Sequence, residues 1–243
     1  MEKPELLKTI AEKSFETSAK FLKGREDLNG VDVLKEWRML LTKKEIKVCV
    51  KHMAYNIQEK FRGKRLVIVC ILRGCVYFFT DLTRNLTIPH SCYMLEMSSY
   101  HDAQTQSKIE ILSLIQANKF KDIDAVLIID ELRDNGTTME TAKQLIIKEG
   151  NVAPEKVFTA ALFEKNHNTP FSPLDFVGIV TPNVWLVGMG LDNFQHMRNW
   201  TYLYACPKAD GVDKDHDDKM FDDNEFYGYV RQQLIQTCND NLK

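Results

Sequence analysis

Short runs of apolar residues alternate along the chain with segments in which apolar residues recur at helical spacing. The runs at residues 65–72 and 125–130 are rich in β-branched residues, as in strands that are buried on both faces. Further strands are predicted at residues 91–97, 109–114, 156–163 and 185–188. Helices are predicted at residues 76–86 and 138–148, and from the capping box of Thr42 and Glu45 through residue 57. This alternation predicts an α/β fold, a mainly parallel twisted sheet flanked by helices.

The chain divides into three predicted parts. Residues 1–40 form an N-terminal helical extension, residues 41–206 carry the strand and helix pattern, and residues 207–243 form an acidic C-terminal tail. The aspartates of the tail are typical of a solvated face or a flexible link, and residues 226–242 are compatible with a closing helix. Residues 98–108 are polar and lack an apolar rhythm, which predicts a mobile loop.

Composition and charge argue against several classes of protein. The chain has 243 residues, of which 44% are hydrophobic, so we expect one domain with a sizeable core. A net charge of −2 gives no reason to expect general attraction to nucleic acid or to an anionic membrane. The apolar runs are too short to span a bilayer, and the first residues do not resemble a secretory signal. None of the six cysteines forms a C-x-x-C pair, so we expect reduced thiols in a cytoplasmic protein.

The most informative segment, residues 126–139, contains the end of a predicted buried strand. That strand ends in two adjacent carboxylates, Asp130 and Glu131, and Asp134 follows three residues later. The next turn opens a helix and consists of small polar residues: Asn135, Gly136, Thr137 and Thr138. Backbone N–H groups at such a turn suit a phosphate, whereas the carboxylates suit sugar hydroxyls or Mg²⁺. The segment therefore predicts a pocket for a ribose 5-phosphate.

This segment resembles the phosphoribosyl-pyrophosphate signature of the type I phosphoribosyltransferases. Other segments resemble the hypoxanthine-guanine branch of that family, and the similarity covers about residues 41–206. The matching motifs occur in order: Leu72-Arg73-Gly74, Ser99-Tyr100, Lys165 after Phe-Glu, residues 175–178, residues 187–192 and Arg198. The resemblance implies the type I fold with a small hood. It also implies an Mg²⁺-dependent enzyme that transfers the phosphoribosyl group to N9 of a 6-oxopurine.

The resemblance further implies which residues bind phosphoribosyl pyrophosphate. Asp130 and Glu131 would hold the ribose hydroxyls and, together with Asp192, Mg²⁺. The turn of residues 135–138 would bind the 5-phosphate, and a loop carrying Ser99 and Tyr100 would close over the site. The leaving pyrophosphate would be held by Leu72, Arg73, Gly74 and Arg198, with a cis peptide between Leu72 and Arg73.

The remaining implied roles concern the purine base. Asp134 would face N7 as the acid–base residue. Lys165 would donate to the 6-oxo group, which favours hypoxanthine or guanine over adenine. Trp185 would stack on the base, and backbone carbonyls near Leu186 and Asp192 would read its 2-position.

The chain departs from the usual family pattern at four places. Arg73-Gly74-Cys75 stands where Lys-Gly-Gly is common, and Asp130-Glu131 stands where Glu-Asp is common. Thr137 stands in place of a lysine, and Asn199 in place of an aspartate. An arginine keeps the positive charge but changes its shape. We expect such changes to alter affinity or rate without removing a role.

Other interpretations stay open at this point. The acidic segment alone would fit a capped helix with a solvated turn, although three carboxylates within five residues repel one another without a partner. A transferase for uracil, adenine or orotate is disfavoured by Lys165 and Trp185. A regulator that senses phosphoribosyl pyrophosphate would need a nucleic-acid module or a basic face, which the sequence does not show. The expected partners are the small-molecule substrates and, from the resemblance, further copies of the chain in a dimer or tetramer.

Overall fold

The computed structural model describes most of the predicted core and one helix of the tail. The described residues are 37–100, 108–166, 169–193, 195–206 and 224–240. The helix expected within residues 1–30, the centre of the polar loop and the first part of the acidic tail lie outside them.

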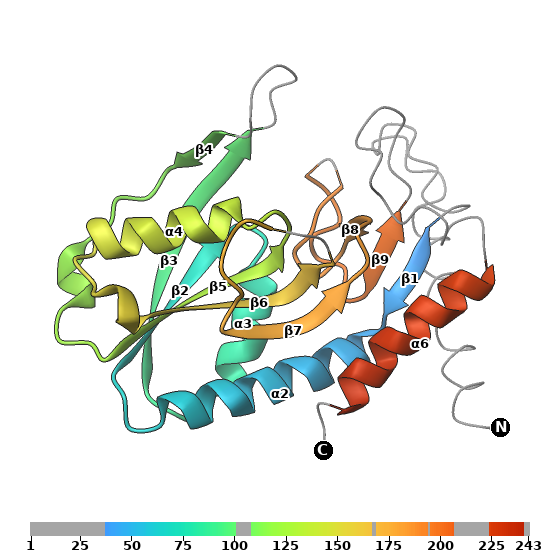
Figure 1. The fold of residues 1–243 in the computed structure, drawn as a ribbon, viewed down its shortest axis with the longest axis horizontal. Coiled ribbons are helices and arrows are strands. Elements are labelled where there is room, and N and C mark those ends of the chain that lie inside the picture. The colour runs from blue at the N-terminus through green and yellow to red at the C-terminus, as the bar shows by residue number, and fades with distance from the viewer. Residues whose placement is uncertain (1–36, 101–107, 167–168, 194, 207–223, 241–243) are drawn as a thin grey trace.

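A six-stranded sheet forms the centre of the molecule, in the order β4-β3-β2-β5-β6-β7 (Figure 1). Its strands are β2 (Leu66–Leu72), β3 (His90–Tyr100), β4 (Lys108–Ile111), β5 (Ala125–Arg133), β6 (Val157–Lys165) and β7 (Phe176–Thr181). Every neighbouring pair is parallel except β3 and β4. The predicted α/β fold with a mainly parallel sheet is therefore confirmed.

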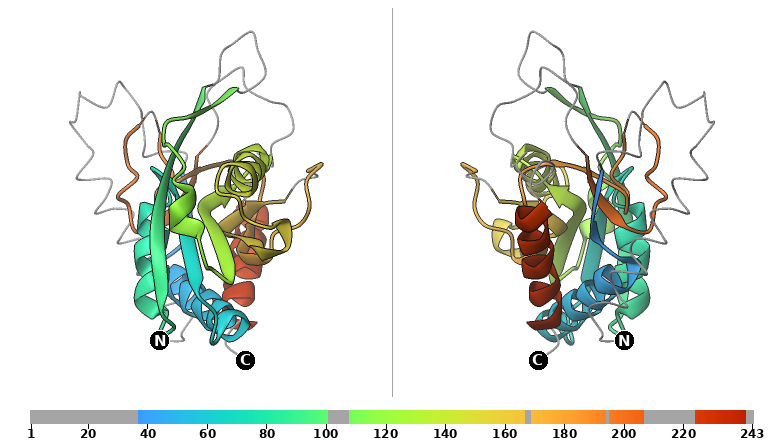
Figure 2. Two further views of the ribbon diagram at one scale, coloured as in Figure 1. Left: turned by 90° about the vertical axis from the view of Figure 1, so that its left-hand side faces the viewer. Right: turned by 90° about the vertical axis from the view of Figure 1, so that its right-hand side faces the viewer.

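Helices cover both faces of this sheet. Helix α4 (Thr137–Lys148) lies on one face, and helices α2 (Lys43–Phe61) and α3 (Val76–Asn85) lie on the other (Figures 1 and 2). Side chains alternate accordingly: Val67 and Val126 pack in the cluster that includes α4, whereas Ile68 and Leu127 pack in the cluster that includes α2 and α3. Because both faces are covered, β2 and β5 are continuously apolar, as predicted.

A second sheet of three antiparallel strands lies beyond the ends of β5, β6 and β7 (Figure 1). Its strands, in the order β1-β9-β8, are β1 (Arg38–Leu41), β9 (Leu203–Cys206) and β8 (Trp185–Val187). The strand predicted at residues 185–188 therefore exists, but it pairs with β9 and not with the central sheet. Strand β1 spans residue 40, the predicted boundary of the N-terminal extension. This small sheet corresponds in position to the expected hood.

The polar segment 98–108 differs from its prediction at both ends. Strand β3 continues to Tyr100 and β4 begins at Lys108, with Ser98 opposite Glu110 in the antiparallel ladder. Figures 1 and 2 show this ribbon projecting beyond the rest of the sheet. A strand that projects in this way has little core to contact, so its residues need not alternate between polar and apolar, and the sequence gives no strand signal.

Other elements agree with the sequence or extend it. Thr42 caps α2, because its Oγ1 accepts from the Glu45 N–H at 3.4 Å while the Glu45 carboxylate accepts from the Thr42 N–H at 2.7 Å. Helix α6 (Asn224–Asp240) covers most of the closing helix considered at residues 226–242. It packs on β1 and α2: the Tyr227 hydroxyl donates to the Met39 carbonyl at 2.7 Å, and Leu234 is buried. Strands β7 and β9 were not predicted.

Two features bear on the environment of the chain. Among the helices that the structure describes, none combines the length and the apolar character needed to cross a bilayer. Cys49, Cys70, Cys75, Cys92 and Cys206 are free thiols.

Phe61 tests the packing of α2 on the sheet. Its ring is fully buried, 5.0 Å from that of Phe158 and 6.1 Å from that of Phe176 between centroids. We expect Phe61→Ala to lower the free energy of unfolding by about 3–5 kcal/mol, because a cavity adds to the lost burial. Tyr55→Ala is the matched control on the same helix, since Tyr55 is 60% exposed. Urea denaturation of both variants checks this, and equal losses would contradict it.

Candidate active site

The residues singled out by sequence gather where the parallel strands end. Leu72 ends β2, Arg133 ends β5 and Lys165 ends β6, so the segments that follow them share one edge of the sheet. In Figure 1 the arrowheads of β5, β6 and β7 point toward the small sheet, which contributes the loop after β8. Ligands of open parallel sheets bind at this edge.

Three backbone segments meet at this edge without room for side chains. A Cβ atom added to Gly74 would lie 1.8 Å from the Glu131 Oε1 atom. A Cβ atom added to Gly190, whose φ is 103°, would lie 2.0 Å from the Gly74 carbonyl oxygen. At Gly190 the neighbour is backbone and φ lies in the left-handed region, so only glycine fits there, whereas a side chain at residue 74 would have to displace the Glu131 carboxylate. The loop after β2, the end of β5 and the loop after β8 are thereby held in contact, and the Leu72–Arg73 peptide is cis, as the family resemblance implied.

Asp130 and Glu131 are adjacent acids near the end of β5, where burial limits their contact with water. Asp130 is 8% exposed, and burial followed by repulsion from Glu131 raises its pKa well above the usual range. Burial also raises the pKa of Glu131, while hydrogen bonding with Asp130 and the positive charge of Arg198 act in the opposite direction. Such a pair is stabilised by a cation, by a proton or by hydroxyl donors.

The donor atoms at this point suit a hard cation. One oxygen each from Asp130 and Glu131 and the Cys75 Sγ atom lie within 4.8 Å of one another. Burial raises the pKa of Cys75 well above its usual range, so its thiol keeps its proton and is a poor ligand. The two carboxylates could hold Mg²⁺, which prefers oxygen ligands.

Asp192 and Arg198 form an ion pair in the loop after β8. Arg198 Nη2 lies 2.7 Å from Asp192 Oδ1, and Arg198 Nη1 donates to the Gly190 carbonyl at 2.8 Å. The Gln195 N–H donates to the other oxygen of Asp192 at 2.7 Å. Both oxygens of Asp192 thus have protein partners, although each keeps a lone pair that could face a cation. Arg198 brings a positive charge close to the acids of β5.

Arg73 and Leu72, which are also predicted to bind pyrophosphate, would offer a ligand different groups. Arg73 extends toward Glu96 on β3, with 3.6 Å between Nε and Oε1, and its side chain is 71% exposed. Leu72 packs partly against the core, so its backbone is the part available to a ligand. The structure thus gives the candidate pyrophosphate loop an exposed guanidinium.

The predicted phosphate turn opens helix α4. Gly136 is the N-cap with φ 87°, a left-handed conformation that favours glycine. The Asn135 side chain accepts from the Thr137 N–H at 3.0 Å, which orders the turn. Thr137 and Thr138, in the first turn of the helix, are partly exposed. The free N–H groups and the dipole at this helix N-terminus could bind an anion.

Asp134 and Lys165 face each other across neighbouring strands. Lys165 Nζ lies 2.8 Å from Asp134 Oδ2, and Lys165 is 6% exposed while Asp134 is 54% exposed. The β5–β6 register, in which Arg133 is opposite Glu164, places the two side chains beside each other. Sequence reasoning assigned both residues to the base without predicting that they pair.

The remaining predicted residues lie near this edge or on the ribbon. Trp185 begins β8 and is 38% exposed, so one part of its ring is open to a ligand, whereas Leu186 is buried. Ser99 and Tyr100 belong to β3 by their backbones, and their side chains lie outside the described set. Closure of the ribbon over the site stays a prediction.

Sequence reasoning missed two parts of this region. Gly190 was quoted only as part of a motif, and its contact with Gly74 has no local signal because the two residues are distant in sequence. Arg133 was quoted but given no role, although a charged residue at the end of an apolar strand is itself a signal.

Comparison with known proteins identifies the family. Residues 36–193 match the model of the phosphoribosyl transferase domain. A hypoxanthine-guanine phosphoribosyltransferase of Dictyostelium discoideum is 30% identical over 169 residues, which is 68% of this chain and 92% of that protein. A hypoxanthine phosphoribosyltransferase of Salmonella typhimurium is 27% identical over 170 residues, with the same shares covered.

Solved structures agree with this assignment. The crystal structure of a hypoxanthine phosphoribosyltransferase from Staphylococcus aureus has a TM-score of 0.60 and 27% identity, and the match covers 74% of this chain and 96% of that one. A hypoxanthine-guanine-xanthine phosphoribosyltransferase, 20% identical with a TM-score of 0.57, supports the fold alone; the match covers 72% of this chain and 99% of that one. The chain therefore belongs to the phosphoribosyltransferase family.

Proposed function

We propose that this chain is a purine salvage enzyme that transfers the phosphoribosyl group of phosphoribosyl pyrophosphate to N9 of a 6-oxopurine. Hypoxanthine and guanine are the expected bases, with xanthine as a further candidate, and the products are the nucleoside monophosphate and pyrophosphate. The observation that carries this proposal is the buried Lys165 ammonium 2.8 Å from Asp134, at the sheet edge that also holds the phosphate turn. The names of the relatives support the same substrates.

The Lys165–Asp134 pair suits both recognition and proton transfer. An ammonium group has three N–H donors, so Lys165 can keep its bond to Asp134 and still donate to a 6-oxo oxygen. An adenine amino group offers no acceptor there and is disfavoured. During transfer, the N9–C1 bond forms while the C1–O bond to pyrophosphate breaks, and the purine loses a proton. Asp134, which is half exposed, is placed to accept or share it.

The other side chains would hold phosphoribosyl pyrophosphate. The turn of residues 135–138 binds the 5-phosphate, and Asp130 and Glu131 hold the ribose hydroxyls and Mg²⁺, with Asp192 as a further ligand. When bound, Mg²⁺ neutralises charge on the pyrophosphate. Arg198 and the loop of Leu72, Arg73 and Gly74 bind the leaving group, and Trp185 stacks on the base, with Leu186 beside it.

The family resemblance suggests how the chain assembles, and its cysteines suggest the compartment in which it works. Homo-oligomers, dimers or tetramers, are expected from the family resemblance, and small molecules are the expected substrates. Five free thiols support a reducing compartment such as the cytoplasm.

Asp134 is the proposed acid–base residue. Asp134→Asn should lower kcat by about 10²-fold or more, because an amide cannot take up the purine proton. Asp122→Asn is the matched control, since Asp122 is exposed and precedes β5 at the opposite edge of the sheet. Steady-state kinetics with hypoxanthine checks both variants. A kcat for Asp134→Asn within threefold of the parent would remove Asp134 from this role.

The buried acids make the reaction depend on a divalent cation. Asp130 and Glu131 repel the polyanionic substrate unless a cation lies between them. EDTA should abolish turnover, and excess Mg²⁺ should restore it. Full turnover in the presence of the chelator would contradict the proposed role of these carboxylates.

Lys165 is the proposed reader of the 6-oxo group. Lys165→Gln removes a charge-assisted hydrogen bond of roughly 1.5–3 kcal/mol, so KM for hypoxanthine and guanine should rise about tenfold to a hundredfold. The gap to adenine should narrow, because glutamine can accept as well as donate. Lys148→Gln, at an exposed lysine of α4, is the control. An unchanged KM for hypoxanthine in the Lys165 variant would mean that O6 is read elsewhere.

A further inference from the structure

Arg133 is a buried cation inside the signature segment, and none of the roles above uses it. It ends β5, immediately before Asp134, and its side chain is 3% exposed. We propose that Arg133 is a positioning residue that holds the phosphate turn and the base-binding lysine in one fixed arrangement. The inference rests on the proposed function, because it concerns the binding of the same two substrates.

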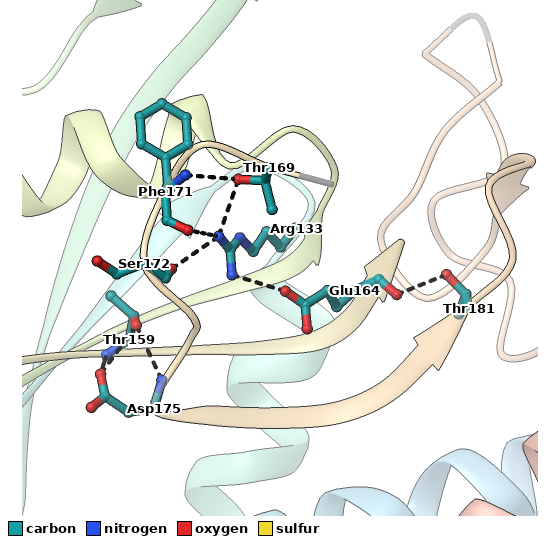
Figure 3. A network of polar contacts seen from close by, with 8 residues as sticks. All are labelled: Arg133, Thr159, Glu164, Thr169, Phe171, Ser172, Asp175 and Thr181. Atoms are coloured by element: carbon teal, nitrogen blue, oxygen red, sulfur yellow. Dashed lines mark hydrogen bonds and ion pairs between the residues drawn. The ribbon is translucent and has the colours of Figure 1, made fainter. Parts of the chain in front are cut away.

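The guanidinium group of Arg133 bonds to two separate segments (Figure 3). Its Nη1 donates to Glu164 Oε1 on β6 at 2.8 Å. Its Nη2 lies within hydrogen-bonding distance of three oxygens in the segment between β6 and β7: Thr169 Oγ1 at 3.3 Å, the Phe171 carbonyl at 3.4 Å and the Ser172 carbonyl at 3.0 Å. Two different nitrogens of the planar fork serve the two directions, whereas a lysine has a single donor nitrogen that would have to lie close to both sets of acceptors.

The segment held by Nη2, residues 169–172, forms a wall behind the phosphate turn. A Cβ atom added to Gly136 would lie 2.9 Å from the Phe171 ring, 3.2 Å from Arg133 Nε and 3.3 Å from Thr169 Oγ1. Gly136 is therefore packed directly against the arginine and the segment that it holds. If this wall moves, the backbone of the turn loses its support on that side.

The bond made by Nη1 acts on the base side of the site. Glu164 precedes Lys165 and lies opposite Arg133 in the β5–β6 ladder. The Glu164 carbonyl also accepts from the Thr181 hydroxyl of β7 at 3.3 Å (Figure 3). Glu164 is thus bonded to both neighbouring strands, through its carboxylate to β5 and through its carbonyl to β7. This restrains the backbone that carries Lys165 next to Asp134.

The segment between β6 and β7 is also attached at its β7 end, and this attachment does not involve Arg133. The Asp175 carboxylate accepts from the Thr159 N–H at 2.8 Å and from its hydroxyl at 3.1 Å (Figure 3). The start of β7 therefore stays anchored to β6 when Arg133 is changed. Loss of the guanidinium should release the 169–172 segment locally and not the whole connection.

The test compares Arg133→Met with the double variant Arg133→Met/Glu164→Gln, which leaves no unpaired carboxylate. Arg65→Met is the control, since Arg65 also pairs with a carboxylate, that of Asp124, but at the opposite edge of the sheet. Four quantities are measured for each protein: Tm, KM and kcat with phosphoribosyl pyrophosphate and hypoxanthine, and Kd for ribose 5-phosphate by calorimetry. The last needs neither a purine nor turnover.

If Arg133 is a positioning residue, restoring the stability of the variant should not restore its affinity for ribose 5-phosphate. The double variant should recover most of the Tm that Arg133→Met loses, yet both should bind ribose 5-phosphate about tenfold more weakly and show a similarly raised KM for phosphoribosyl pyrophosphate. In Arg65→Met, Kd and KM should stay within twofold. Changes in Tm alone, with Kd and KM at parental values in the double variant, would overturn the proposal.

Arg133→Lys keeps the inference testable if the methionine variants do not fold. A lysine can pair with Glu164 but cannot also hold the 169–172 segment, so Tm should approach that of the parent while ribose 5-phosphate binds several-fold more weakly. Parental affinity in this folded variant would overturn the proposal. Failure of the parent to act on any 6-oxopurine would count against the proposed function alone, because the ribose 5-phosphate comparison would still report on Arg133.

Discussion

The close approach of Gly74, Glu131 and Gly190 is the contact on which the whole site depends. Strand β5 is buried on both faces until it reaches its acids, and there the Glu131 carboxylate lies against Gly74, whose carbonyl in turn lies against Gly190. Packing this close removes water from around the acids, which is why burial is the main cause of their raised pKa values. The same contact brings the candidate pyrophosphate loop, the candidate metal ligands and the loop after β8 to one point.

The negative charges of the two acids on β5 are only partly compensated within the chain, and a substrate could compensate the rest. Asp130 is buried beside the partly buried Glu131, and Arg198 is shared with Asp192, so its charge compensates only part of theirs. Buried charges are stable only when they are paired or hydrogen-bonded. In the proposed function, ribose hydroxyls and a divalent cation would supply what the chain itself lacks. The phosphate turn carries the opposite bias, because a helix N-terminus favours an anion. Acids and turn together therefore match a ligand that carries both hydroxyls and phosphates.

The sequence predicted those parts of the fold whose cause is local. Buried strands such as β2 and β5 have continuous apolar runs, and Thr42 with Glu45 marks the start of α2, so both were found. Strand β8 was found but its partner was not, because three residues do not reveal which sheet they join. Strand β9 was missed because its pairing with β1 depends on backbone that is distant in sequence, and the polar ends of the β3–β4 ribbon were missed because side-chain periodicity does not mark them.

Within the site, residue types were predictable and their partners were not. Lys165 and Asp134 were each assigned to the base, but the 2.8 Å ion pair between them follows from the β5–β6 register, which fixes their backbones side by side. In the proposed function, base recognition and proton transfer would therefore share one pair of charges. A shift of either strand end would disturb both functions at once, and effects of changing the two residues should not be additive. Arg133 lies opposite Glu164 in that same register, so the residue that we propose to position the pair is a charged side chain at the end of an apolar strand, a signal to which the sequence analysis assigned no role.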